Sequence, residues 1–102
     1  MSHTYALLVS GKRHTHLLTL EDIAVQCGLH PTVVQHCVML GIIDPEEGYR
    51  DAFRPEMTTR LQRFLRLRRD LGIGYQAAAL VMDLLERIDM LEARLRRLEA
   101  QR

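Results

Sequence analysis

Charged side chains in this 102-residue chain fall into an acidic stretch followed by a basic one. Between Thr19 and Asp51 stand six carboxylates and one basic residue, Arg50, a formal net charge of −5. Residues 54–69 hold six arginines and Glu56, a formal net charge of +5. Clustered carboxylates attract a cationic partner, whereas clustered guanidinium groups suit phosphates and other anions. The overall charge of +1 therefore hides two segments with opposite binding chemistry.

Five histidines and two cysteines are the residues from which a metal site would be built. His14 and His16 are two apart and His36 adjoins Cys37, but no paired spacing typical of structural zinc is present. We interpret Cys27 and Cys37 as reduced core residues on buried helix faces. The chain also lacks a nucleophile elbow and a phosphate-cradling glycine loop. We therefore expect no metal, no cofactor and no enzymatic activity.

The acidic stretch opens with TLEDIAVQCGLHPTVVQHCVMLGIIDP (residues 19–45), which predicts two short helices joined by a tight turn. Thr19 and Asp22 have the spacing of a capping box at the start of the first helix. Gly28 suits the left-handed position that ends a helix, and Pro31 suits the first turn of the next. Gly41 ends the second helix. The segment is typical of a helix-turn-helix.

Segments of other kinds flank this helical pair. Alternation over residues 3–9 predicts a short strand, and residues 13–18 are compatible with a return strand after a turn. Residues 46–53 predict the tight turn of a wing. The expected fold class is mostly α: a winged helix-turn-helix core with a short N-terminal β segment and a long C-terminal helix.

The arginines lie on a third helix, predicted over residues 55–71. Its apolar stripe consists of Leu61, Phe64, Leu65 and Leu71, and Arg63, Arg66 and Asp70 point away from it. Arg68 projects into the stripe. We expect its guanidinium to pair with an acid of the last helix, such as Asp83.

The last predicted helix carries a heptad pattern, whose apolar side needs a second surface to bury it. Positions a and d of the heptad are Val81, Ile88 and Leu95, and Leu84, Leu91 and Leu98. This pattern predicts a homodimer with residues 1–75 as the winged domain and residues 76–102 as the dimerisation helix. The alternative is an amphipathic helix that folds back on its own domain.

Charges beside this heptad pattern bear on the direction of pairing. Arg87 and Arg94 occupy g positions, and Glu92 and Glu99 occupy e positions. A parallel pair would match each Arg with a Glu of the second chain, whereas an antiparallel pair would bring like charges together. Exposed ion pairs contribute little, so packing could overrule this preference and both directions stay open.

The second helix would read bases in a DNA-binding protein. Its expected outward side chains are Thr32, Gln35, His36 and Met39, none of which is Arg or Lys. Gln35 could contact an adenine, but nothing near it would hold a phosphate. Nucleic acid is therefore not the partner we expect.

Two motifs carry a resemblance to known families. Residues 19–53, with Gly-Tyr-Arg at 48–50 and the aromatic Phe53, resemble the MerR-type winged helix. Arg-Leu-Arg-Arg-Asp-Leu at 66–71, a short break through Tyr75, and Ala-Ala-Ala-Leu-Val-Met-Asp-Leu-Leu-Glu-Arg-Ile at 77–88 look like the chaperone-modulator family CbpM. This likeness covers about residues 19–98. Residues 10–16 depart from it, because the segment is longer than the family needs.

The resemblance implies a small, cytoplasmic, non-enzymatic protein. Members of that family bind the J-domain of the DnaJ-like co-chaperone CbpA and inhibit it both as a chaperone partner and as a DNA binder. J-domains present a basic helix, which the acidic segment of this chain would attract. The longest apolar run, residues 77–82, is too short to cross a bilayer, so we expect no membrane partner and a cytoplasmic location.

Two alternatives to this function stay open. One is a MerR-like transcription regulator that holds phosphates with its Arg-rich helix and wing, and the other is an interaction module with an unrelated target. For the J-domain partner, charge alone predicts the site. It consists of Glu21, Asp22, Asp44, Glu46 and Glu47, with Val33 and Met39 as apolar contacts.

Overall fold

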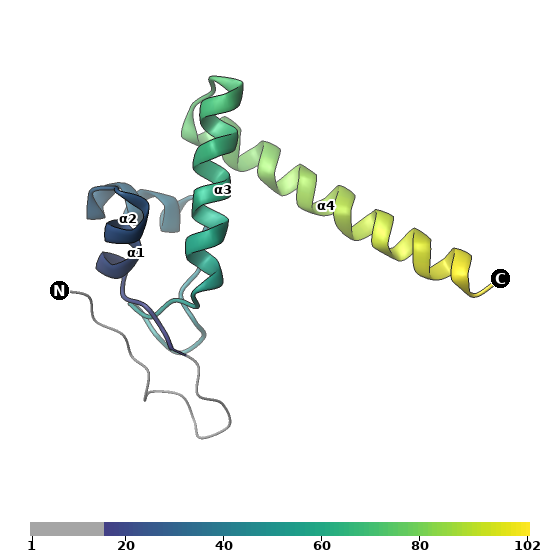
Figure 1. The fold of residues 1–102 in the computed structure, drawn as a ribbon, viewed down its shortest axis with the longest axis horizontal. Coiled ribbons are helices and arrows are strands. Elements are labelled where there is room, and N and C mark those ends of the chain that lie inside the picture. Colours follow the sequence, from purple (N-terminus) through teal and green to yellow (C-terminus); the bar gives the residue numbers. More distant parts are fainter. Residues whose placement is uncertain (1–15) are drawn as a thin grey trace.

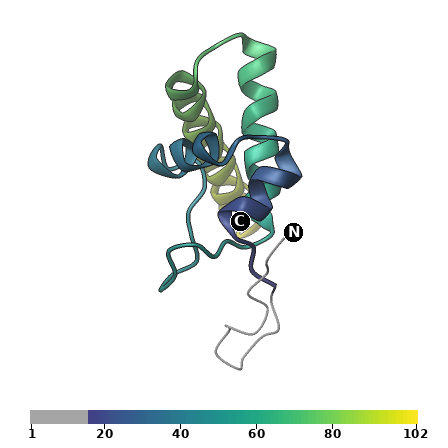
Figure 2. The ribbon, with the colours of Figure 1, turned by 90° about the vertical axis from the view of Figure 1, so that its left-hand side faces the viewer.

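A computed structural model describes residues 16–102 of the chain as four helices, with a longer connecting segment over residues 40–55 between the second and the third (Figure 1). They are α1 (Leu20–Cys27), α2 (Pro31–Met39), α3 (Glu56–Leu71) and α4 (Tyr75–Ala100). Helix α1 packs against α2 and α3, and α4 packs against α3. Beyond this contact, α4 extends away from the side of α3 on which α1 and α2 lie (Figures 1 and 2). The expected mostly helical fold is confirmed.

Local capping signals set the ends of the first two helices. The Thr19 hydroxyl accepts a hydrogen bond from the Asp22 backbone N–H at 3.0 Å, and the Asp22 carboxylate accepts one from the Thr19 N–H at 2.9 Å. This reciprocal capping box was predicted from the sequence. Gly28 adopts the left-handed conformation (φ 68°) that closes α1, and Pro31 begins α2, as the sequence indicated.

One hydrophobic core joins all four helices. Its largest fully buried apolar side chains are Phe53, Phe64, Ile23, Ile43, Leu61 and Val34. From α4, Ala78 and Met82 belong to the same core. Leu71 does not, contrary to the expected stripe of α3, and 53% of its surface is exposed. The last turn of α3 rises beyond α2 and so has no neighbour on that side (Figure 1).

Residues around the wing form a compact turn at the base of the domain. The Glu46 N–H donates to the Ala52 carbonyl at 2.7 Å, and Gly48 takes the positive φ of 87° that the turn requires. Leu18 and Phe53 exchange two backbone hydrogen bonds of 2.7 Å, the one β pairing within residues 16–102. The strand predicted over residues 3–9 and the first half of the return strand predicted over 13–18 lie outside the described residues.

Candidate functional site

The exposed surface of α2 carries no Lys, Arg, Asp or Glu. Neither α1 nor α2 contains Lys or Arg, and the outward residues predicted from the sequence are all exposed, namely Thr32, Gln35, His36 and Met39. Met39 exposes 83% of its surface. Val33, the second apolar residue expected at the site, is half-buried. This surface offers a partner apolar and neutral polar groups but no cation for a phosphate.

The acidic residues of the domain divide into two groups. Glu21, Asp44 and Glu47 are exposed and form no ion pair within the described residues. Asp22 is only 1% exposed, because its carboxylate caps the N-terminus of α1. The Asp22 carboxylate is therefore buried within the fold and is not accessible to a partner.

Two further carboxylates at the wing are engaged. Glu46 accepts two hydrogen bonds from the Arg54 guanidinium, Nε–Oε1 at 2.8 Å and Nη2–Oε2 at 3.1 Å. The hydrogen bond from Arg54 holds the pKa of Glu46 below its usual value. Asp51 accepts a 2.7 Å hydrogen bond from the Leu20 N–H, which ties the wing to the start of α1. Glu21, Asp44 and Glu47 therefore remain as the unpaired acidic surface.

Two arginines of the basic segment act inside the fold. Arg60 donates from Nε to the Ile42 carbonyl and from Nη1 to the Glu86 carboxylate of α4. The guanidinium carbon of Arg68 lies 4.3 Å from the centroid of the Tyr75 ring. The expected pairing of Arg68 with Asp83 is wrong, because Asp83 pairs with Arg87 one turn along α4, at 3.2 Å. An aromatic face takes the place of the acid.

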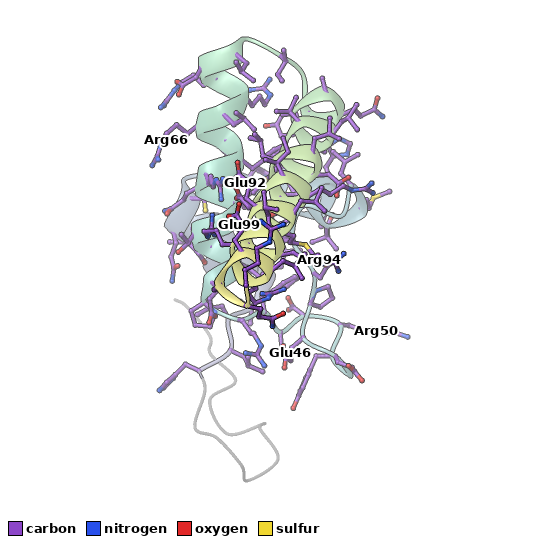
Figure 3. All side chains as sticks on the ribbon, turned by 90° about the vertical axis from the view of Figure 1, so that its right-hand side faces the viewer. Glu46, Arg50, Arg66, Glu92, Arg94 and Glu99 are labelled. Carbon is purple, nitrogen blue, oxygen red and sulfur yellow. The ribbon has the colours of Figure 1, made fainter. Side chains whose placement is uncertain are left out.

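Three other arginines form the outer face of α3. Arg63, Arg66 and Arg69 are exposed, and Arg69 approaches Asp70 no closer than 3.9 Å. Arg66 and Arg50, the basic residue of the wing, project to opposite sides of the molecule in Figure 3. Arg66 and Arg50 would therefore not contact one stretch of DNA backbone from the same side of the molecule.

The seam predicted on α4 is largely open to solvent. Val81 is half-buried, and the other five residues expose between 49% and 61% of their surface: Leu84, Ile88, Leu91, Leu95 and Leu98. The alternative that the whole helix folds back on its own domain does not describe this structure, since only its first turns contribute buried residues, Ala78 and Met82. A contiguous apolar strip of this length marks an interaction surface.

The cysteines have the character of core residues. Cys37 is fully buried, and burial raises the pKa of its thiol to about 11, with a further contribution from Cys27. Cys27 is half-buried, and burial raises its pKa as well. Within residues 16–102 no three His, Cys, Asp or Glu side chains lie together as metal ligands would. In the same residues no helix meets the length and apolarity needed to span a membrane.

Two short helices joined through a left-handed glycine define a helix-turn-helix protein, and in residues 16–102 the turn after them is anchored by a single β bridge between Leu18 and Phe53. A family model described as MerR HTH family regulatory protein matches residues 18–100. The chain belongs to this family of regulatory proteins.

Sequence reasoning missed two residues that organise the domain. Tyr75 of α4 contacts two other helices: its ring lies 5.8 Å from those of His36 on α2 and Phe64 on α3, in addition to its contact with Arg68 of α3. Arg60 joins α3 to α4 and to the segment after α2. The one available signal was Arg68 itself, since a cation in an apolar stripe needs either an acid or an aromatic face.

Proposed function

We propose that this protein is a stoichiometric modulator that binds the J-domain of a CbpA-like co-chaperone and inhibits its co-chaperone and DNA-binding activities. The observation that carries the proposal is the charge of the helix-turn-helix surface. Its two helices lack Lys and Arg, and three exposed carboxylates form no ion pair within the described residues. A surface of this sign attracts a basic helix and repels the phosphates of DNA.

The proposed contact surface is smaller than charge counting indicated. It retains Glu21, Asp44 and Glu47, with Val33 and Met39 as apolar contacts. Two predicted contacts leave it: Asp22 is buried, and Glu46 is neutralised by Arg54. The remaining carboxylates steer association, and the exposed Met39 is suited to a hot spot that excludes water.

The proposed modulator is a homodimer joined through α4. Its seam exposes five large apolar side chains that the rest of the chain does not cover. A second copy of the same seam would bury them. Sedimentation equilibrium at micromolar concentration measures this directly, and a monomer there would remove the dimer from the proposal.

Titration calorimetry with the isolated J-domain of a CbpA-like co-chaperone tests the partner. Reversal of Glu21, Asp44 and Glu47 together to Lys is expected to weaken binding at least about tenfold, with a loss that shrinks as salt is raised. Asp89→Lys is the control, because it makes the same kind of charge change on the exposed part of α4. Equal affinity of the triple variant and wild type would exclude this surface, and absence of heat with wild type would exclude the partner.

A DNA-binding regulator is the second candidate, favoured by the exposed Arg63, Arg66 and Arg69 of α3. A gel-shift series with duplex DNA across salt concentrations separates the candidates. A shift with a steep salt dependence supports the regulator, since each phosphate contact releases counterions. Circular dichroism of each variant confirms that the helical fold is retained.

A further inference from the structure

The outer face of α3 carries positive charge that the rest of the described chain leaves largely unpaired. Residues 54–69 contain six arginines, and three of them are occupied by two carboxylates and an aromatic ring. Arg63 and Arg66 are exposed and form no ion pair within residues 16–102. Arg69 is exposed as well, and its 3.9 Å approach to Asp70 is at the outer limit of an ion pair. We call these three exposed residues the arginine stripe.

The arginine stripe follows the side of α3 that is opposite its buried residues. Residues three apart on an α-helix lie about 4.5 Å apart along the axis and differ by about 60° in direction, so the stripe is about 9 Å long. Leu61 and Phe64, on the opposite side of the helix, are fully buried in the core. In Figure 3, Arg66 projects outward from α3 and away from α4. A helix that packs against α1 and α4 therefore holds the stripe in a fixed position.

Exposed carboxylates stand at both ends of the arginine stripe. Glu56 lies on the same side of α3 about two turns before Arg63, and Asp70 lies about one turn after Arg66. Phosphates follow one another without interruption along a nucleic acid, so a strand that ran past either end would bring its charge against a carboxylate. A short protein segment can place its acids on the stripe alone. The charge pattern of α3 therefore favours an acidic protein segment over a nucleic acid.

A hollow beside the arginine stripe offers a place for an uncharged side chain. It has a volume of about 360 Å³ and is lined by Gln62, Leu65, Arg66 and Arg69. Leu65 is half-buried and supplies an apolar contact, and the Gln62 amide can both donate and accept hydrogen bonds. An apolar contact with charged groups around it is the usual arrangement of a protein–protein interface, in which Arg is enriched.

We propose that the arginine stripe is a second interaction surface, which binds an acidic helical segment of a partner protein. The segment presents carboxylates at every third or fourth position, the spacing that brings side chains to one face of a helix. Each guanidinium can then form two parallel hydrogen bonds with a carboxylate. An apolar side chain between the carboxylates enters the hollow against Leu65. The stripe includes none of the residues proposed for the J-domain, so this surface goes beyond that function.

Fluorescence anisotropy with a labelled synthetic peptide tests this surface. The peptide is an Ala-rich helix of about five turns with Glu and one Leu along a single face, and the control peptide has the same composition with Glu spread around the helix. We expect the wild type to bind the first peptide at least about fivefold more tightly than the second. Asp70→Ala should raise the affinity for the first peptide about twofold, because it removes the like charge at one end of the stripe.

Substitution of the arginine stripe locates the binding. Alanine at all three of its positions should weaken peptide binding at least about tenfold, with a loss that shrinks as salt is raised. The matched control is Arg94→Ala with Arg96→Ala and Arg97→Ala, which removes three exposed arginines from α4. Because these residues lie outside the stripe, the control should change the affinity by less than about twofold. Circular dichroism confirms that each variant keeps the helical fold.

Three results would overturn the proposal. One is the absence of peptide binding by the wild type. Another is an equal loss in the stripe and α4 variants, which would indicate attraction to total positive charge alone. The third is binding of duplex DNA, but not of the peptide, that is lost in the stripe variant, because the surface would then serve a nucleic acid. Alanine substitution of the stripe should not weaken the J-domain titration, so neither experiment decides the other.

Discussion

The neighbours Glu21 and Asp22 provide the sharpest test of how this structure uses its acids. Both were counted as partner contacts, yet Glu21 is exposed and Asp22 is 1% exposed. Asp22→Ala removes the buried 2.9 Å hydrogen bond to the Thr19 N–H and leaves that donor unsatisfied. Loss of a charged acceptor from a buried donor costs about 1.5–3 kcal/mol.

The other half of the capping box, the Thr19 hydroxyl, should contribute less stability than the Asp22 carboxylate. Thr19→Ala removes the hydroxyl that accepts from the Asp22 N–H at 3.0 Å, a change that costs about 1 kcal/mol in helix N-caps. Thr19→Ser keeps the hydroxyl, so it should cost only about a few tenths of 1 kcal/mol of unfolding free energy. Glu21→Ala is the matched control, expected within about 0.5 kcal/mol of wild type because the side chain is exposed.

Chemical denaturation followed by circular dichroism measures these values at one fixed protein concentration, because dimerisation would make stability depend on concentration. The expected order of destabilisation is Asp22→Ala, then Thr19→Ala, then Glu21→Ala. The affinity for the J-domain is expected to fall only for Glu21→Ala, the variant with the smallest effect on stability. An Asp22→Ala variant as stable as Glu21→Ala would refute the capping role and return Asp22 to the binding surface.

Two further predictions follow from perturbed pKa values. Cys37 should resist iodoacetamide at pH 8 in the folded protein, because the thiol is fully buried with a pKa of about 11. It should react in denaturant, as mass spectrometry would show, and alkylation of Cys37 before Cys27 in the folded state would contradict this. The second concerns Glu46, whose pKa is lowered from the ordinary value of 4.5 by its hydrogen bond with Arg54. The pair therefore stabilises the fold fully at pH values above 4.5, and this stabilisation is lost as the pH falls through the pKa of the folded state. Glu46→Gln should therefore flatten the acid side of a stability–pH curve slightly, whereas the unpaired Glu47→Gln should leave its slope unchanged.

The helix ends were predictable because their signals are local. A capping box involves residues three apart, and Gly28 and Pro31 act through their own backbone. The structure confirms all three at the expected positions. Such features depend on near neighbours in the chain, so they survive whatever the tertiary arrangement turns out to be.

Features that depend on the placement of separate helices were not predictable in the same way. Arg68 meets Tyr75 because the turn at Gly72 returns α4 onto α3 at a particular angle. Leu71 is 53% exposed although its spacing places it in the apolar stripe of α3, because a helical period cannot reveal where neighbouring helices cover that stripe.

The sequence assigned too many carboxylates to the acidic site for a related reason. Composition treats every carboxylate as free surface charge, but three in this domain hold other parts of the chain. Asp22 caps α1, Asp51 accepts from the Leu20 N–H, and Glu46 pairs with Arg54. Of these three carboxylates only Glu46 forms an ion pair, with Arg54, so even a rule that matched opposite charges would have missed the two backbone contacts.

The bridge made by Arg60 bears on how rigid an assembly of this protein would be. One guanidinium fastens the exit of α2 at Ile42 and the side of α4 at Glu86. Helix α4 cannot pivot at the turn over residues 72–74 unless these Arg60 hydrogen bonds break. In the proposed dimer, this contact would therefore fix the spacing between the two domains within each subunit.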